Sequence, residues 1–384
     1  MPINEKFSGS FSNILPIAGK TLIYMCSLVL TIALCTGLII SPVAADQTPE
    51  YTGDYKIIDA LDYHICSAMD DAYAGAMEVR KHFWLPDDAV AGQIPNQDLY
   101  GQSEDPAQLG WLLEDANPLL NGQSTLFTTE TPILEGSVVN YYLDDSIMAI
   151  TWKQVFENIV YTISEVKIDD PSQFRRHLAD NEFGSAHHYF STEMSKTTNA
   201  VVAINGDFYH NRDYGIVVYD RQLLRFKYSA KLDACFVDSK GNLNFAYRGE
   251  LPDEKSVQDY VQEHDIVFAI AFGPVLIDNG VRCEPPSYPF GEVNDRYPRA
   301  ALCQYDELHY LLITVTGQGP YRKWQNIHDL AKIIDTFGVQ KAYTLDGGRT
   351  ANLIMNHQLI NELNYDSLRP MSDILYFATA VPHN

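Results

Sequence analysis

Residues 301–315, ALCQYDELHYLLITV, decide the fold class. Two mainly apolar runs, Ala301–Gln304 and Tyr310–Val315, lie on either side of the polar pair Asp306-Glu307. A polar turn between two apolar runs is typical of a β-hairpin, whose two strands are antiparallel. This stretch therefore predicts a sheet that contains antiparallel strands.

Similar patterns recur along the chain after Asp145. Helical spacing of apolar residues from Ile327 to Phe337 predicts a helix that Gly338 ends, and Pro171 predicts the start of a shorter one. Strands divided by few helices predict an α+β domain: a mixed, largely antiparallel sheet with flanking helices. Apart from the first hairpin, the predicted strands are Ser146–Trp152, Ile159–Ile168, Val201–Ile204, Cys235–Val237, Leu243–Ala246 and Ala342–Leu345.

An apolar segment near the N-terminus predicts a membrane location. Leu22–Ile40 contains no charged residue and follows Lys6 and Lys20. Its length fits the ~20 residues of a membrane-spanning helix, and the lysines favour a cytoplasmic N-terminus. Small residues at Pro42–Ala45 also fit a signal peptidase site, so a cleaved signal is the alternative to an anchor. Either way, the rest of the chain is predicted to lie outside, membrane-anchored or secreted.

The chain divides into three predicted parts. Residues 1–45 are the tail and membrane segment, residues 46–145 an acidic N-terminal appendage or stalk, and residues 146–384 the main domain. In the appendage, Trp111 and the pair Phe83-Trp84 are expected to pack against the domain rather than bind sugar, because large aromatic residues dominate core burial.

The net charge restricts the possible partners of the chain, and the cysteine content bears on whether it contains disulfides. The formal net charge of −23 argues against nucleic acid as a partner, because that polymer attracts clustered Lys and Arg. Any anionic ligand then requires a local arginine site. Four cysteines follow residue 45, and disulfides or buried free thiols are both compatible with an exported chain. These cysteines are Cys66, Cys235, Cys283 and Cys303.

Three polar clusters follow apolar strands, where active sites are commonly built. The first is Asn205-Gly206-Asp207, which a simple turn would also explain. In the second, Arg299 enters an apolar strand and needs an anionic partner, either a structural carboxylate or a bound phosphate. The third is Thr344–Asn352, where Asp346 is placed like a nucleophile or base and Gly347 and Gly348 allow close approach to a ligand.

The order of several motifs resembles the phosphodiester glycosidase family, which includes uncovering-enzyme-like domains and a branch of bacterial exopolysaccharide biosynthesis proteins. The resemblance covers the chain from about Ser146 onward. The motifs are NGDFY at 205–209, FGPVLIDNG at 272–280, PRAAL at 298–302, TGQG at 316–319, LDGG at 345–348 and the closing MSDILYF at 371–377. The chain departs from the family where Thr usually follows the PR arginine and Gly-Ser follows DGG, since it has Ala300 and Arg349-Thr350.

The resemblance implies an extracytoplasmic hydrolase that cleaves the sugar–phosphate bond of a sugar-1-phosphodiester, in cell-envelope or exopolysaccharide metabolism. No cofactor is implied, although a divalent cation is possible. The expected catalytic residues are Asp346, Asp207 and Arg299, and the expected substrate-binding residues are Asn205, Gly206, Gly347, Gly348 and Arg349.

Two other functions remain open. One is a non-catalytic protein that binds envelope polysaccharide or teichoic acid, which the departures at Ala300 and Arg349 favour. The other is a metal-assisted phosphodiesterase that uses Asp207, His210 and Asp213, which have ligand-like chemistry without a recognised spacing.

Overall fold

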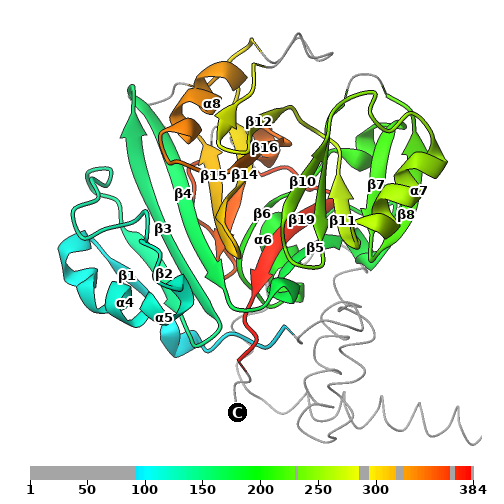
Figure 1. Ribbon diagram of the computed structural model, residues 1–384. Coiled ribbons are helices and arrows are strands. Elements are labelled where there is room, and N and C mark those ends of the chain that lie inside the picture. Colours follow the sequence, from blue (N-terminus) through cyan, green and yellow to red (C-terminus); the bar gives the residue numbers. More distant parts are fainter. Residues whose placement is uncertain (1–91, 230–231, 285–293, 317–323, 364–367, 382–384) are drawn as a thin grey trace, which may run out of the picture. The chain divides into compact units, whose positions relative to one another are not determined.

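Antiparallel sheets form the framework of the structure, a computed structural model (Figure 1). It describes residues 92–229, 232–284, 294–316, 324–363 and 368–381, all of which belong to one unit of the chain, Arg80–Asn384. Every strand pairing among these residues is antiparallel. The prediction of a sheet-rich, largely antiparallel fold with few helices is thus confirmed, whereas the parallel pairing that a mixed sheet would include does not occur among the described residues.

The largest sheet has nine strands in the order β1-β2-β3-β4-β15-β14-β16-β12-β13. The hairpin predicted at 301–315 forms its centre, with Leu302 opposite Leu312. Its strands are β1 Tyr100–Ser103, β2 Val139–Leu143, β3 Ile147–Phe156, β4 Ile159–Ile168, β12 Val275–Asp278, β13 Val281–Arg282, β14 Arg299–Asp306, β15 His309–Val315 and β16 Lys341–Leu345.

Two five-stranded sheets complete the framework. One has the order β10-β9-β11-β7-β8 and the other β18-β17-β6-β19-β5. The first contains β7 Gly215–Tyr219, β8 Gln222–Lys227, β9 Ala234–Asp238, β10 Leu243–Ala246 and β11 Ile266–Ile270. The second contains β5 Phe174–Leu178, β6 Ala200–Asn205, β17 Leu353–Met355, β18 Gln358–Leu359 and β19 Asp373–Ala378.

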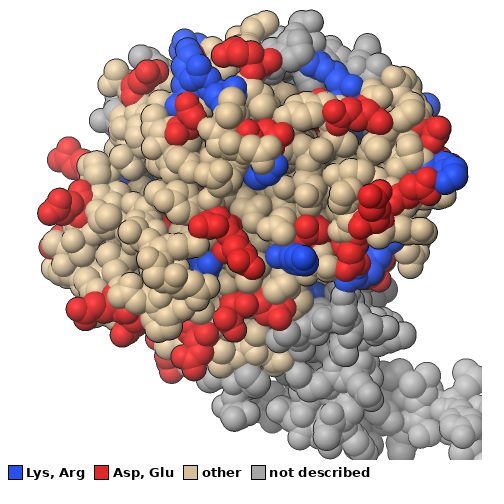
Figure 2. All heavy atoms as spheres, viewed as in Figure 1, with Lys and Arg blue, Asp and Glu red and all other residues tan. Residues whose placement is uncertain are grey.

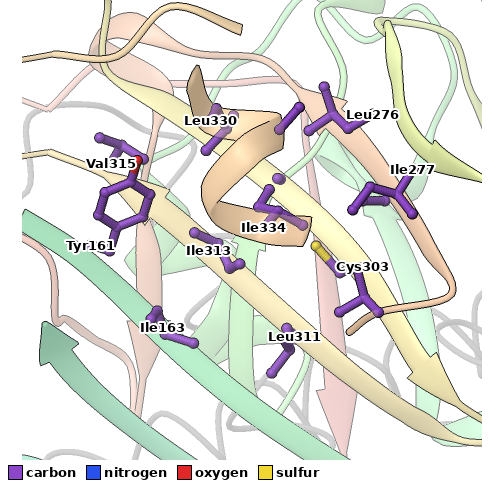
Figure 3. Packing of buried hydrophobic residues seen from close by; sticks show 14 of the residues in the cluster. Tyr161, Ile163, Leu276, Ile277, Cys303, Leu311, Ile313, Val315, Leu330 and Ile334 are labelled. Carbon is purple, nitrogen blue, oxygen red and sulfur yellow. The ribbon is translucent and has the colours of Figure 1, made fainter. Parts of the chain in front are cut away.

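Short helices flank these sheets. The predicted helix after residue 326 forms α8, which buries Leu330 and Ile334 against the nine-stranded sheet (Figure 3). Pro171 opens a 3₁₀ turn, Pro171–Gln173, as predicted. The α-helices are α4 Gly110–Asp115, α5 Asn117–Leu120, α6 Ser191–Thr197, α7 Glu254–Glu263 and α8 Ile327–Asp335. The further 3₁₀ turns are Gln97–Leu99, Pro106–Leu109, Ala179–Asn181, Tyr209–Asn211 and Gly348–Thr350.

Both faces of the nine-stranded sheet are buried at its centre. Ala301 and Cys303 of β14 belong to the core beneath α8, whereas Ala300 and Leu302 pack in a second core with residues of β6, β17 and β19. Because successive side chains of a strand point to opposite faces, this double burial explains why β14 is apolar almost throughout. The second core fixes the ends of β6 and β19 close to the end of β16.

Two strands also form before residue 145. Strand β1 pairs with β2, and β2 pairs with β3, so residues 100–143 extend the nine-stranded sheet. Gln93 also bridges to Thr379. The acidic, loop-rich composition of this segment hid the two strands. Trp111 packs its edge on Tyr141 with ring centroids 5.7 Å apart, although 49% of its surface stays exposed.

Several predictions lie outside the described residues: the membrane segment 22–40, the cleavage site near residue 45, residues 46–91 of the appendage with Phe83-Trp84 and Cys66, and most of the TGQG motif. No helix within the described ranges is long and apolar enough to cross a membrane. Cys235, Cys283 and Cys303 are free thiols, and Cys235 and Cys303 are buried.

Candidate active site

Three strand ends meet to form the candidate active site. β6 ends at Asn205, β16 ends one residue before Asp346, and β19 begins at Asp373. The Asp346 amide donates to the Gly206 carbonyl at 3.2 Å, and the Gly206 amide donates to the Asp373 carbonyl at 3.2 Å. The fold therefore unites the first and third sequence clusters, together with a third carboxylate from the closing MSDILYF motif.

Asp346 is partly buried and held by its own loop. Its Oδ1 accepts the Gly347 amide at 2.8 Å, and its Oδ2 accepts the Thr350 hydroxyl at 2.6 Å. Burial raises the pKa of the Asp346 carboxyl to about 6, even though these two hydrogen bonds and the charge of Arg369 act to lower it. A carboxyl group that titrates near neutral pH is suited to proton transfer.

Asp207 is fully engaged by protein groups. It is 4% exposed and forms an ion pair with Arg212, and its oxygens accept the amides of Phe208 at 2.5 Å and Ala271 at 2.9 Å. Burial alone would raise the pKa of Asp207, but Arg212 and Arg176 hold it below its ordinary value. This environment keeps Asp207 ionised and leaves its oxygens little capacity for a ligand.

Asp373 and Arg176 form a buried pair that the sequence analysis missed. The Arg176 Nε donates to Asp373 Oδ2 at 2.7 Å, and both side chains are fully buried. Asp373 Oδ1 also accepts the amide of Asp207 at 3.0 Å. Burial raises the pKa of Asp373 to about 6 against the charge of Arg176. The signal was a charged residue at the start of an otherwise apolar strand.

The side chain of Asn205 connects backbone segments of the site. It is 1% exposed, its Nδ2 donates to the Asp346 carbonyl at 2.7 Å, and its Oδ1 accepts the Asn352 amide at 3.2 Å. The structure thus places Asn205 beneath the loop that carries Asp346, where it fixes the position of that loop.

The two glycines after Asp346 serve the loop in different ways. A Cβ atom at Gly347 would lie 2.6 Å from the Pro298 carbonyl oxygen, and Gly348 has a φ of +69° that favours glycine. The Gly347 amide donates to Asp346, and the Gly348 amide donates to Pro298 at 2.9 Å. Both amides, which were expected to face a ligand, have acceptors within the protein.

Arg299 also has protein partners. It is 5% exposed, its Nε donates to the Gln325 carbonyl at 3.0 Å, and its Nη2 donates to the Asp295 carbonyl at 2.7 Å. Its guanidinium lies over the ring of Tyr297. Backbone carbonyls thus accept hydrogen bonds from two of its charged donors.

Two other arginines of this region, Arg349 and Arg369, are exposed. Arg349 is exposed within the turn that follows Asp346. Arg369, which the sequence analysis did not single out, is exposed, lies over the ring of Phe208 at 5.5 Å, and lowers the pKa of Asp346 through its charge. On the face seen in Figure 2, basic side chains are few and scattered among acidic ones, so local arginines of this kind are what an anion can use.

His188 adds a neutral polar group near Arg369. Burial lowers its pKa, and the positive charges of His210 and Arg369 lower it further. Its ring meets the ring of His210 edge-on at 4.2 Å. Its Nε2 is buried and has no hydrogen-bond partner among the described residues.

The metal-site alternative finds no geometric support in this region. Asp207 pairs with Arg212 and Asp213 pairs with Lys227, so two of the three residues named for it already have cationic partners. Within the described ranges, no three His, Cys, Asp or Glu side chains group in a way that could hold a metal ion.

Comparison with known families agrees with the motifs. Residues 198–378 match the model of the phosphodiester glycosidase family. The matched stretch contains Asp207, Asp346 and Asp373. It confirms, for this part of the chain, the resemblance that the sequence indicated.

Solved structures and curated proteins add two further results. The chain is similar to the catalytic domain of zebrafish N-acetylglucosamine-1-phosphodiester alpha-N-acetylglucosaminidase, auto-inhibited by its pro-peptide, with 22% identity, a TM-score of 0.46, and coverage of 65% of this chain and 85% of that one. It is also similar to a hypothetical protein from Synechocystis, with 13% identity, a TM-score of 0.45, and coverage of 66% and 65%. A comparison with curated proteins found no match.

Proposed function

We propose that this protein hydrolyses the bond between the anomeric carbon and the phosphate of a sugar-1-phosphodiester. The observation that carries the proposal is Asp346: a partly buried carboxyl with a pKa of about 6, which the charge of the exposed Arg369 influences, within a stretch that matches the phosphodiester glycosidase family. The predicted N-terminal membrane segment further suggests that the substrate is a cell-envelope or extracellular polymer.

The reaction requires a base that accepts the proton of the attacking water and positive charges that stabilise the leaving phosphate. Water attacks the anomeric carbon, Asp346 accepts the water proton, and the bond to the phosphate oxygen breaks with its electron pair leaving on the phosphate. The leaving phosphate is already a stabilised anion, so neutralising its charge matters more than protonating it. Arg369 and Arg349 are the exposed guanidinium groups that can supply this charge.

The buried charges hold the reacting group in place. Asp207 and Asp373 share Arg176, and Arg212 completes the set on Asp207. We assign them a positioning role, because their oxygens are occupied by protein donors. Asn205 and Gly206 connect this set to the Asp346 loop through their backbone and amide contacts. Arg299 holds the segments at Asp295 and Gln325 by donating hydrogen bonds to their backbone carbonyls.

The proposal is tested with the purified full-length chain and a panel of sugar-1-phosphodiesters, including an N-acetylglucosamine-α-1-phosphodiester. Release of free sugar is followed by NMR, and the first anomer formed reports the stereochemistry. We expect turnover that the Asp346→Asn variant loses and the Arg282→Gln variant keeps, because Arg282 lies in an exposed hairpin with only distant carboxylate contacts. Saturable binding of the panel without turnover would instead support the glycan-binding alternative.

A further inference from the structure

A surface cavity is lined by β1, β2 and the β17–β18 hairpin, and none of the site residues described above lines it. Its volume is about 220 Å³. This is far more than the ~30 Å³ that one water molecule occupies in the liquid, yet less than the ~300–1,000 Å³ of a site for a drug-sized ligand. The space is therefore suited to one small ligand unit.

The lining of this cavity is rich in side-chain amides and uncharged. None of its ten lining residues is Asp, Glu, Lys or Arg, although the chain carries 77 such residues in total, 27 basic and 50 acidic. The polar lining residues are Gln97, Gln102, Asn140, Asn356, Gln358 and the aromatic Tyr100 and Tyr141. Such a lining offers no counter-charge for an anion and many donors and acceptors for a neutral polar ligand.

The paired strands β1 and β2 contribute part of the cavity lining. Gln102 of β1 lies opposite Asn140 of β2, and the Gln102 Nε2 donates to the Asn140 Oδ1 at 2.8 Å. This bond leaves the Gln102 carbonyl oxygen and the Asn140 amino group without a hydrogen bond to any described residue. Asn140 is only 7% exposed, so its remaining donors gain from a ligand in the cavity.

The β17–β18 hairpin also lines the cavity. Met355 lies opposite Gln358 across a two-residue turn in which Asn356 and His357 have φ values of 48° and 60°. Positive φ at both positions is typical of a type I′ turn and matches the twist of a hairpin. The His357 ring bonds to Ser195 of α6 at 3.1 Å and fixes the turn. Unlike His357, Gln358 does not fix the turn, so its side-chain amide is available to bind a ligand in the cavity.

We propose that this cavity binds one neutral sugar unit of a glycan. An amide presents a donor and an acceptor side by side, which matches the adjacent hydroxyl groups of a sugar ring, and the Tyr100 ring offers an apolar surface beside them. Gln102 and Asn140 lie before the stretch that matches the glycosidase family, and Gln358 lies within it. The site is thus a glycan-binding site added to the catalytic domain, and it does not depend on the proposed hydrolysis.

The test measures sugar binding by the full-length chain that carries Asp346→Asn, so that turnover cannot interfere. The probes are the methyl glycosides of glucose, galactose, mannose and N-acetylglucosamine, with cellobiose and chitobiose, followed by saturation-transfer NMR and calorimetry. We expect at least one probe to bind saturably. Adding Gln102→Ala or Gln358→Ala should raise the dissociation constant of that probe about tenfold, the usual consequence of one lost hydrogen bond.

Gln258→Ala on the exposed face of α7 is the matched control and should bind as the parent does. Thermal melting verifies that each variant is folded. Gln358→Glu is the second variant, because a charge on an exposed hairpin residue should preserve the fold while impairing a neutral site. The proposal is overturned if no probe binds saturably, or if binding persists unchanged in the Gln102 and Gln358 variants. Inorganic phosphate that competes with the sugar for this site would also contradict it.

Discussion

The carboxylate of Asp373 lies in the space that Gly206 leaves open. A Cβ atom at position 206 would approach Asp373 Oδ2 to 2.4 Å, closer than packed atoms allow. Since Arg176 binds the same oxygen at 2.7 Å, a side chain at 206 must displace a buried ion pair rather than a flexible group.

We predict that Gly206→Ala lowers the free energy of unfolding by about 1–3 kcal/mol, the usual cost of overpacking a core. Chemical denaturation measures this change. The matched control is Gly110→Ala, where the nearest atom to the added Cβ is 3.9 Å away. A Gly206→Ala protein as stable as the control would show that the Asp373 carboxylate is free to move.

Asp346 predicts how activity changes with pH. Its pKa of about 6 means that the carboxylate needed to accept a proton is lost as the pH falls through 6. We therefore expect kcat/KM to rise between pH 5 and about pH 7 with an inflection near 6. A profile that is flat across this range would remove Asp346 from the role of base.

The contribution of Asp346 to the stability of the protein should fall as the pH rises, whereas the activity rises. A raised pKa means that the folded chain holds the Asp346 proton more tightly than the unfolded chain does. This contribution to stability is present below about pH 4 and is lost as the pH rises through about 6. Asp346→Asn removes the cost of ionisation, so the variant should be at least as stable as the parent at pH 7.5 while being inactive. Thermal melting measured beside turnover separates the two effects.

Thr350 tunes the carboxyl group of Asp346. Its hydroxyl donates to Asp346 Oδ2 at 2.6 Å and helps to lower the pKa of that group. Thr350→Val keeps the shape and removes the hydroxyl, so the inflection of the activity profile should move about one pH unit higher. Thr350→Ser keeps the hydroxyl and should leave the inflection in place. Equal profiles for Val and Ser would mean that this hydrogen bond has no influence on Asp346.

Local patterns predicted the strands well and the tertiary partners poorly. The strand predicted at Ile159–Ile168 matches β4, and the predicted hairpin at 301–315 forms β14 and β15, because turn residues and apolar runs act over a few positions. β1 and β2 escaped notice, since the loops around them are acidic and the strand that joins them to the sheet, β3, pairs with β2 from outside the segment.

The same limit applies to the site. Sequence motifs located Asp207 and Asp346, but whether a carboxylate is free or ion-paired depends on residues distant in the chain. Arg176 lies 197 positions before Asp373, and no spacing rule connects them. The motif also drew attention to Arg299, which donates hydrogen bonds to two backbone carbonyls, and away from Arg369, which follows no recognisable pattern.

Arg299 and Arg369 should therefore respond differently to substitution. Arg369→Gln removes an exposed charge close to Asp346 and should leave the fold intact while reducing kcat/KM roughly 10²-fold, as the loss of one charge-stabilising donor commonly does. Arg299→Ala removes a buried guanidinium and its hydrogen bonds to the carbonyls of Gln325 and Asp295, so it should lower the free energy of unfolding by about 1–3 kcal/mol.

Denaturation curves and steady-state kinetics on both variants distinguish the two roles. Arg282→Gln provides the reference for loss of a charge far from the site. If Arg299→Ala proved as stable as the parent but failed to bind the phosphodiester, Arg299 would be the phosphate ligand after all. In that case the carbonyl contacts would have to give way when the substrate binds, and the role assigned to Arg369 would pass to Arg299.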